Sequence, residues 1–282
     1  MWTSATLQLG PERSLHYAQG GAGADLLAIH GAFTTHHDWL TGPAGELSAS
    51  HRVTVVDRPG HGDSRRPRFA GTPRDQADQI AQGMDRLGVA RALVLAHSFG
   101  GAVALALAER HKERVSGLVL VAPIAFPEPR LLEHLMLAPR ALPIAGPILS
   151  WLAERSRVDR AMLEFAQREM FRPATVSTHW RDTFPWDHIL NTDAMVFEGE
   201  DAAAMLPFSP AGTFDFRRID VPIRILTGSS DRIVRPEQQG EALARLLPSA
   251  SSTVIEGAGH MLHHSHPEAV LEAVAELSPL PI

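Results

Sequence analysis

The sequence contains no cysteine among its 282 residues. Disulfide bonds, thiolate catalysis and zinc or iron–sulfur sites held by cysteine are therefore excluded. An excess of positive charge is also missing, because 26 lysines and arginines face 32 acidic residues and the net charge is −6. A general nucleic-acid binder presents a broad basic face, so we expect no nucleic-acid partner.

Long uninterrupted hydrophobic runs are absent as well. The most apolar long stretch, Leu131–Ala153, is interrupted by Glu133, His134, Arg140 and three prolines, whereas about 20 consecutive apolar residues are needed to span a bilayer. The first residues, MWTSATLQLGPER, show neither the basic region nor the apolar core of a secretory signal. We therefore expect a cytoplasmic protein without stable membrane insertion.

What the chain does contain is a regular alternation of short apolar segments with helix-like ones. Its hydrophobic content of 44% and charged content of 21% are typical of a globular protein. Apolar runs of four to six residues suit strands covered on both faces, and the alternation predicts an α/β fold with a mostly parallel sheet. The expected strands are Leu26–His30, Arg52–Asp57, Ala92–Ala96, Gly117–Ala122, Ile223–Thr227 and Ser252–Ile255. The expected helices are Pro73–Leu87, Gly100–Arg110, Pro236–Leu247 and Pro267–Leu277.

One segment, residues 126–209, interrupts this alternation. It reads as helical throughout and holds nine of the 17 aromatic residues of the chain. Because it follows a strand whose end should face a ligand crevice, we expect a helical cap over an apolar pocket, with residues 1–125 and 210–282 forming the core domain. The aromatic rings could instead form a small satellite core. The stretch Leu131–Ala153 could line the pocket, which is the simplest interpretation, or form an exposed face, a dimer contact or a lipid-interface patch.

The strongest chemical signal is the segment Leu93–Gly101, LVLAHSFGG. A buried strand runs into Ser98, two glycines and an apolar helix, which is the context of a nucleophile elbow. Bulky residues two positions before or after the serine would collide with the strand and the helix. Ala96 and Gly100 occupy those positions. The alanine replaces the usual glycine but is still small.

Further segments at the ends of predicted strands complete the pattern. They are HGAF (residues 30–33), DRPGHGDS (57–64), GSSDRIV (228–234) and, after the last strand, GAGH (257–260). With them the chain resembles the α/β-hydrolase superfamily along almost its whole length outside the cap. It is similar to the capped, serine-dependent esterases, lactonases and carbon–carbon bond hydrolases. The haloalkane dehalogenases and epoxide hydrolases carry aspartate at the nucleophile, where this chain has Ser98.

The resemblance implies a triad in the chain order nucleophile, acid, histidine, which Ser98, Asp231 and His260 obey. Some relatives place the acid after the strand before the cap, where the first carboxylate of this chain is Glu128. Asp231 is therefore favoured as the acid. Three further histidines lie close to His260 and are expected to pack or face water rather than act, with no metal bound and no cofactor needed: His263, His264 and His266.

An oxyanion intermediate needs preorganised N–H donors. The resemblance implies the backbone N–H groups of Phe99 and Ala32, with Phe33 as the alternative to Ala32. His30 is expected to anchor its loop. The loop residues Asp57, Arg58 and His61 are likewise expected to order the chain around them. Candidate pocket residues are Phe33, His97, Phe126, Trp151, Trp180 and Trp186.

The hypothesis that follows is a cofactor-independent serine hydrolase that cleaves a small-to-medium, apolar carboxylic ester or lactone through an acyl-enzyme. Two alternatives stay open: hydrolysis of a carbon–carbon bond in a vinylogous diketone from aromatic ring cleavage, and a non-catalytic ligand-binding protein on a hydrolase fold. The sequence gives no information on the acyl or alcohol group, nor on the oligomeric state.

Overall fold

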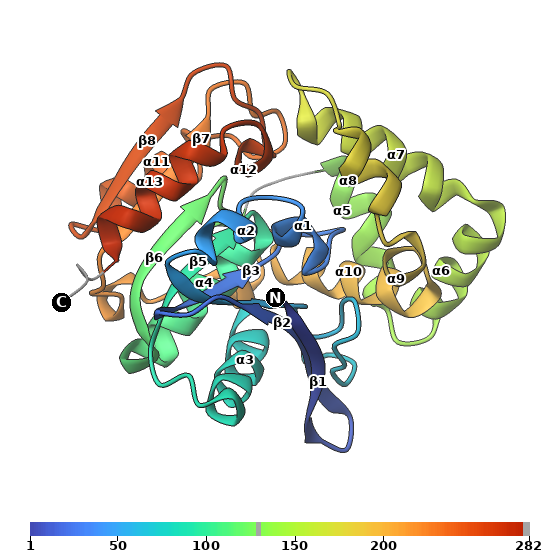
Figure 1. Ribbon diagram of the computed structural model, residues 1–282. Helices are drawn as coiled ribbons and strands as arrows, with labels where there is room; N and C mark the ends of the chain where they lie inside the picture. Colours follow the sequence, from blue (N-terminus) through green and yellow to red (C-terminus); the bar gives the residue numbers. More distant parts are fainter. Residues whose placement is uncertain (128–130, 279–282) are drawn as a thin grey trace.

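The computed structural model describes residues 1–127 and 131–278. The strands in these residues form one eight-stranded sheet (Figure 1). The strand order is β1-β2-β4-β3-β5-β6-β7-β8. Neighbours from β4 to β8 pair in parallel, whereas β1 and β2 form an antiparallel hairpin at one edge. The strands are β1 (Thr3–Gly10), β2 (Arg13–Gly20), β3 (Ala24–Ile29), β4 (His51–Val56), β5 (Ala92–His97), β6 (Val115–Val121), β7 (Ile223–Gly228) and β8 (Ala250–Ile255).

Both faces of the sheet are covered by helices. Successive residues of a strand point to opposite faces, and in β3 the side chains of Leu27 and Ile29 enter one apolar cluster while Leu26 and Ala28 enter another. The first cluster contains α3 (Pro73–Leu87), α4 (Phe99–Arg110) and α11 (Gly240–Leu246). The second contains α1 (His37–Leu40), α2 (Ala44–Leu47), α12 (Leu262–Ser265) and α13 (Pro267–Leu277).

The predicted fold class is confirmed, and all six predicted strands occur within two residues of the expected bounds. The hairpin of β1 and β2 was not predicted, because β1 is exposed along most of its length and therefore lacks a buried apolar run. The predicted helix Pro236–Leu247 begins later than expected, at Gly240, since the preceding residues form turns.

Between β6 and β7 the chain leaves the sheet and forms a group of helices, seen beside the sheet in Figure 1. The described part of residues 126–209 is helical and contains no strand, as the sequence predicts for this segment. Its helices are α5 (Leu131–Leu137), α6 (Ala145–Ser156), α7 (Val158–Phe171), α8 (Thr178–Thr183), α9 (Trp186–Ile189) and α10 (Thr192–Ala204). The described residues also form the 3₁₀ turns η1 (Lys112–Arg114), η2 (Ala138–Ala141), η3 (Pro210–Gly212) and η4 (Phe216–Arg218).

Buried charges attach helix α10 of this cap segment to the loop after β4. The fully buried Arg58 guanidinium donates to the Asp201 carboxylate at 2.5 Å, and the His61 ring lies 3.0 Å from the same oxygen. Arg66 adds ion pairs to Asp201 and to Glu200. Burial opposes ionisation of Asp201, but Arg58 and His61 outweigh it and hold the pKa of that carboxyl below its usual range. Arg58 and His61, which the sequence predicts to order their own loop, thus also connect this loop to α10.

Replacing Asp201 with Asn should destabilise the protein strongly. The change removes the anion that faces two buried guanidinium groups, and such a loss costs about 3 kcal/mol. Urea unfolding followed by circular dichroism measures it. The matched control is Asp215→Asn, which removes an exposed ion pair with Arg217, keeps a side-chain oxygen that can accept from Arg217 N, and should leave the unfolding midpoint unchanged. Equal midpoints for wild type and Asp201→Asn would show that this cluster does not stabilise the fold.

Candidate active site

Ser98 lies in a strained turn between β5 and α4. Its backbone has φ 53° and ψ −120°, a conformation that non-glycine residues rarely adopt. The turn is held by hydrogen bonds from Ser98 N to Val121 O at 3.0 Å and from Ile124 N to Ser98 O at 2.9 Å. A Cβ atom at Gly100 would lie 2.6 Å from the carbonyl oxygens of both Ile29 and His30. Glycine at this position therefore lets α4 begin directly against the end of β3.

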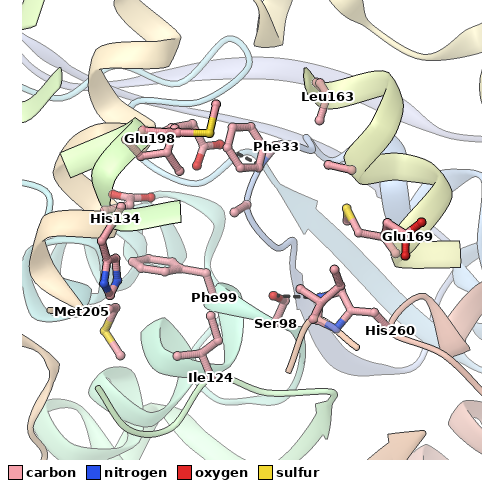
Figure 2. Close-up of a pocket in the computed structure, with 18 of the residues that line it drawn as sticks. Phe33, Ser98, Phe99, Ile124, His134, Leu163, Glu169, Glu198, Met205 and His260 are labelled. Atoms are coloured by element: carbon pink, nitrogen blue, oxygen red, sulfur yellow. Dashed lines mark hydrogen bonds between the residues drawn. The ribbon is translucent and has the colours of Figure 1, made fainter. Parts of the chain in front are cut away.

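Three side chains that are distant in sequence meet at this turn. His260 Nε2 lies 3.1 Å from Ser98 Oγ, and His260 Nδ1 lies 2.9 Å from Asp231 Oδ2. Figure 2 shows the serine and imidazole side chains directed toward each other. All three residues are buried, with at most 8% of their surface exposed. The structure thus brings together the three residues that the sequence singles out, in an arrangement that can pass a proton from the hydroxyl to the ring.

Asp231 is fixed as an ionised acceptor by its loop. Its Oδ1 accepts hydrogen bonds from Ile233 N at 2.8 Å and Val234 N at 2.9 Å, while Oδ2 faces the histidine. Burial raises the pKa of the carboxyl, but His260 and the two N–H donors outweigh it and the pKa is lowered. The alternative acid, Glu128, lies outside the described residues.

The histidine is supported from behind by a layer that sequence reasoning missed. His97, predicted to line the pocket, lies fully buried under the His260 ring with ring centroids 4.7 Å apart. Its Nε2 lies 3.2 Å from the His260 carbonyl oxygen, so the neutral ring donates there. The prediction of a pocket role for His97 is therefore corrected: it holds the backbone of His260 instead.

Below this layer the buried Asp38 carboxylate accepts from His263 Nε2 at 3.1 Å and from His264 Nε2 at 2.8 Å. Burial raises the pKa of Asp38, yet these donors lower it well below its usual range. Burial also lowers the pKa of His263 to about 3, so its ring is neutral at neutral pH. The expectation that both histidines only pack or face water is thus too simple. Their closeness to the triad depends on the short helices α1 and α12, which no local sequence signal predicts.

The loop after β3 carries the candidate oxyanion donors. His30 anchors it as expected, with Nδ1 near Gly31 O at 2.8 Å and Nε2 accepting from Arg58 N at 2.9 Å. The N–H of Phe33 is already engaged, because it donates to Glu198 Oε1 on α10 at 2.7 Å. This favours Ala32 over Phe33 as the partner of Phe99. Phe99 begins α4, so its N–H has no acceptor within the helix.

A largely apolar cavity of about 470 Å³ opens onto Ser98 and His260 (Figure 2). Phe33 and Phe126, both predicted, contribute to its wall. Polar groups are few, and Glu198 and Glu169 are among them. The remaining lining residues, apart from Ser98 and His260, are Ala32, Phe99, Ile124, His134, Met136, Leu137, Met162, Leu163, Phe165, Ala166, Met170, Asp201, Ala202, Met205, Arg232 and Ile233.

The three predicted pocket tryptophans lie elsewhere. Trp180 is 1% exposed and packs with Phe171 and Phe184 in a separate apolar cluster of the cap, against which Trp186 also packs. Trp151 is 49% exposed on the outside of α6. Trp180 and Trp186 therefore belong to a satellite core rather than to the wall of the cavity. Trp151 belongs to neither. Methionines line the cavity instead, which a flexible, unbranched side chain allows.

Three clusters in the described part of the chain have donor spacings that a metal ion could use. Each has another account. The cluster of His61, Glu198 and Asp201 already faces the guanidinium groups of Arg58 and Arg66, which supply its positive charge. In the cluster of His16, His36 and Asp57, the His36 ring is hydrogen-bonded to Asp57, while the ring nitrogens of His16 are engaged by Ser4 and Thr6. In the cluster of Asp38, His263 and His264, both histidines are hydrogen-bonded to the aspartate.

Comparison with known proteins places this geometry in a family. A stretch of 114 residues is 40% identical to the dihydrolipoyllysine-residue acetyltransferase component of an acetoin cleaving system from Cupriavidus necator, covering 40% of this chain but only 30% of that relative. Over 275 residues, the chain is 29% identical to a 2-hydroxymuconate semialdehyde hydrolase from Pseudomonas putida, covering 93% of this chain and 89% of the relative.

Structural comparison agrees on the fold. A thermophilic esterase from Thermogutta terrifontis superposes with a TM-score of 0.72 at 23% identity, covering 97% of both chains. The model of the alpha/beta hydrolase family matches residues 26–273, which include the parallel part of the sheet, the Ser98 turn and the loops that carry Asp231 and His260. The chain therefore belongs to the alpha/beta hydrolase family.

Proposed function

We propose that this protein is a serine hydrolase that cleaves a carboxylic ester or lactone of a small-to-medium, largely apolar substrate. The observation that carries the proposal is the continuous hydrogen-bonded chain from Ser98 through His260 to Asp231, with the serine facing an apolar cavity. A volume of about 470 Å³ suits a small-molecule site. The named esterase is one of the solved structures that share this fold.

In the acylation step, Ser98 Oγ attacks the ester carbonyl carbon and its proton passes to His260 Nε2. Asp231 holds the ring through Nδ1 and stabilises the imidazolium. The negative charge that forms on the carbonyl oxygen is bound by the N–H groups of Ala32 and Phe99. The intermediate collapses, His260 gives its proton to the leaving alkoxide, and an acyl-enzyme remains.

In the deacylation step, a water molecule gives its proton to His260 and its oxygen attacks the acyl carbon. The second intermediate collapses, the proton returns to Ser98 Oγ, and the carboxylic acid leaves. The fixed position of His260 matters for both steps because the same ring accepts and then donates a proton. The layer of His97, Asp38 and His263 beneath it restricts how far the ring can move.

Hydrolysis of a carbon–carbon bond is the second candidate. The observation that favours it is the 29% identity to a 2-hydroxymuconate semialdehyde hydrolase over most of both chains. The same triad and oxyanion donors would serve that reaction, so only substrates distinguish it. Efficient turnover of a ring-cleavage product together with negligible turnover of short esters would favour this candidate over the ester or lactone.

Replacing Ser98 with Ala should leave the protein folded and lower ester turnover by about 10⁴-fold, because the nucleophile is lost. Turnover of a short p-nitrophenyl ester and the mass shift after fluorophosphonate treatment measure this. Wild type should gain a single adduct that the variant lacks. The control is Ser209→Ala, a change at a serine outside the cavity. A Ser98→Ala variant with near-wild-type turnover would contradict the assignment.

Replacing Asp231 with Asn should lower kcat by about 10⁴-fold with little change in KM, because the ring of His260 loses its anionic partner and its tautomer. Steady-state kinetics on the same ester measure the two constants separately. Glu237→Gln, at an exposed carboxylate a few residues away, is the matched control and should behave as wild type. An unchanged kcat in Asp231→Asn would direct attention to Glu128 as the acid.

The buried histidine layer should make stability depend on pH. The unfolded chain binds a proton at a histidine below about pH 6.5, whereas folded His263 binds one only near pH 3. The free energy of unfolding therefore falls as the pH drops through this window, by about 1.4 kcal/mol for each unit. The variant His263→Gln keeps an N–H toward Asp38 but cannot titrate. Its urea midpoint should therefore fall less than that of wild type between pH 7.5 and pH 5.5, the latter being roughly one unit below the ordinary pKa of histidine.

The control for this measurement is His179→Gln, at an exposed histidine of α8. Its ring meets water in both the folded and the unfolded chain, so the pH dependence should match that of wild type. Identical pH dependence in His263→Gln and wild type would show that His263 takes up its proton over the same pH range in the folded and the unfolded chain.

A further inference from the structure

Helix α6 of the cap has its side chains arranged in the reverse of the usual order. A surface helix normally buries its large apolar side chains and exposes polar ones. The residues that α6 buries are all small: Gly146, Ser150 and Ala153. Its large apolar residues point outward, and Ile148 and Leu152 are 54% and 51% exposed.

Large apolar residues on α5 and between η2 and α6 are exposed as well, and these elements pack on one another. We call the whole set, together with the exposed residues of α6, the cap face. Ile144, just before α6, is 79% exposed. Large exposed apolar patches are uncommon on monomeric proteins and mark sites of interaction. The cap face consists of Leu135, Met136, Leu142, Ile144, Ile148, Leu149, Trp151 and Leu152.

The segment that carries the cap face has a net charge opposite in sign to that of the whole chain. Residues 134–172 contain six arginines and four acidic residues, a net charge of +2, whereas the whole chain carries −6. Arg155 lies over the Trp151 ring at 5.0 Å from its centroid, at the border of the cap face. Tryptophan and arginine beside exposed aliphatic residues are typical of protein surfaces that lie in the headgroup region of a lipid layer.

The cap face also leads into the cavity. Met136 lines the cavity and is 38% exposed, and Phe165 on α7 lines it and is 63% exposed. An acyl chain could therefore pass from an apolar phase at the cap face into the site without crossing a polar surface. A second copy of this chain on the cap face would instead cover this route.

We propose that the cap face docks on an anionic lipid surface and that the substrate is a lipid-phase ester whose acyl chain enters past Met136 and Phe165. The docking is peripheral, since none of the helices in residues 1–127 and 131–278 is long and apolar enough to cross a bilayer. The apolar side chains enter the interface, and Arg155 at its border faces the lipid phosphates. The substrate part of this inference rests on the proposed ester hydrolysis, but the docking part does not.

The test is flotation of the full chain with vesicles of phosphatidylcholine alone or mixed with phosphatidylglycerol. Wild type should float with the anionic vesicles, less so at high salt and less with the neutral ones. The double variant Ile144→Asn with Ile148→Asn should bind about tenfold more weakly, because two aliphatic side chains no longer enter the interface. The matched control is Leu246→Asn with Val254→Asn, at exposed apolar residues outside the cap (56% and 44% exposed), and it should float as wild type does.

Two further measurements separate the possible failures. Turnover of a water-soluble short ester should be equal in wild type and both double variants, whereas turnover of a long-chain ester presented in anionic vesicles should fall only in the cap-face variant. Wild type that stays unbound to both kinds of vesicle overturns the docking, and short-ester turnover still reports on the proposed function separately. Sedimentation that shows a wild-type dimer, and a monomer only for the cap-face variant, would assign the surface to a second copy and also overturns the proposal.

Discussion

The close approach of α4 to the end of β3 is the constraint on which the rest of the site depends. Because Gly100 has no Cβ, the start of α4 lies against the carbonyl groups of Ile29 and His30. This contact places the strained turn of Ser98 beside the loop after β3, where a Cβ atom at Gly31 would lie 3.0 Å from Ser98 Cβ. A larger residue at position 100 would push the Ser98 turn away from this loop.

The second constraint is electrostatic and concerns how the cap is held. Helix α10 presents Asp201 to Arg58 and Glu198 to the N–H of Phe33, so it contacts both the loop after β4 and the loop after β3. The apolar wall of the cavity is therefore positioned by buried charges rather than by apolar packing alone. The Glu198 carboxylate thus connects α10 directly to the backbone of the loop that carries Ala32.

The parts of the site that the sequence predicts are those attached to strand ends. Ser98, Asp231 and His260 each follow a strand of the parallel part of the sheet, so chain order alone brings them to one edge. Glu198 and Asp38 could not be found in this way, because the face that a helix turns toward the site depends on tertiary packing. The cap aromatics show the same limit: Trp180 and Trp151 both read as apolar helix residues, yet one is buried in a satellite cluster and the other is exposed.

The exposed cap face, like the turn of Ser98, results from a close approach of two elements that only a glycine allows. A Cβ atom at Gly146 would collide with the carbonyl oxygen of Arg140, so α6 can lie this close to η2 only with a glycine on its inner side. The large apolar residues of α6 have no space on that side and must point outward. Arg140 is itself buried against Asp159 of α7, which fixes η2 in place. The same close packing that shapes the cap therefore exposes an apolar surface beside the mouth of the cavity, where a docked lipid layer would cover it.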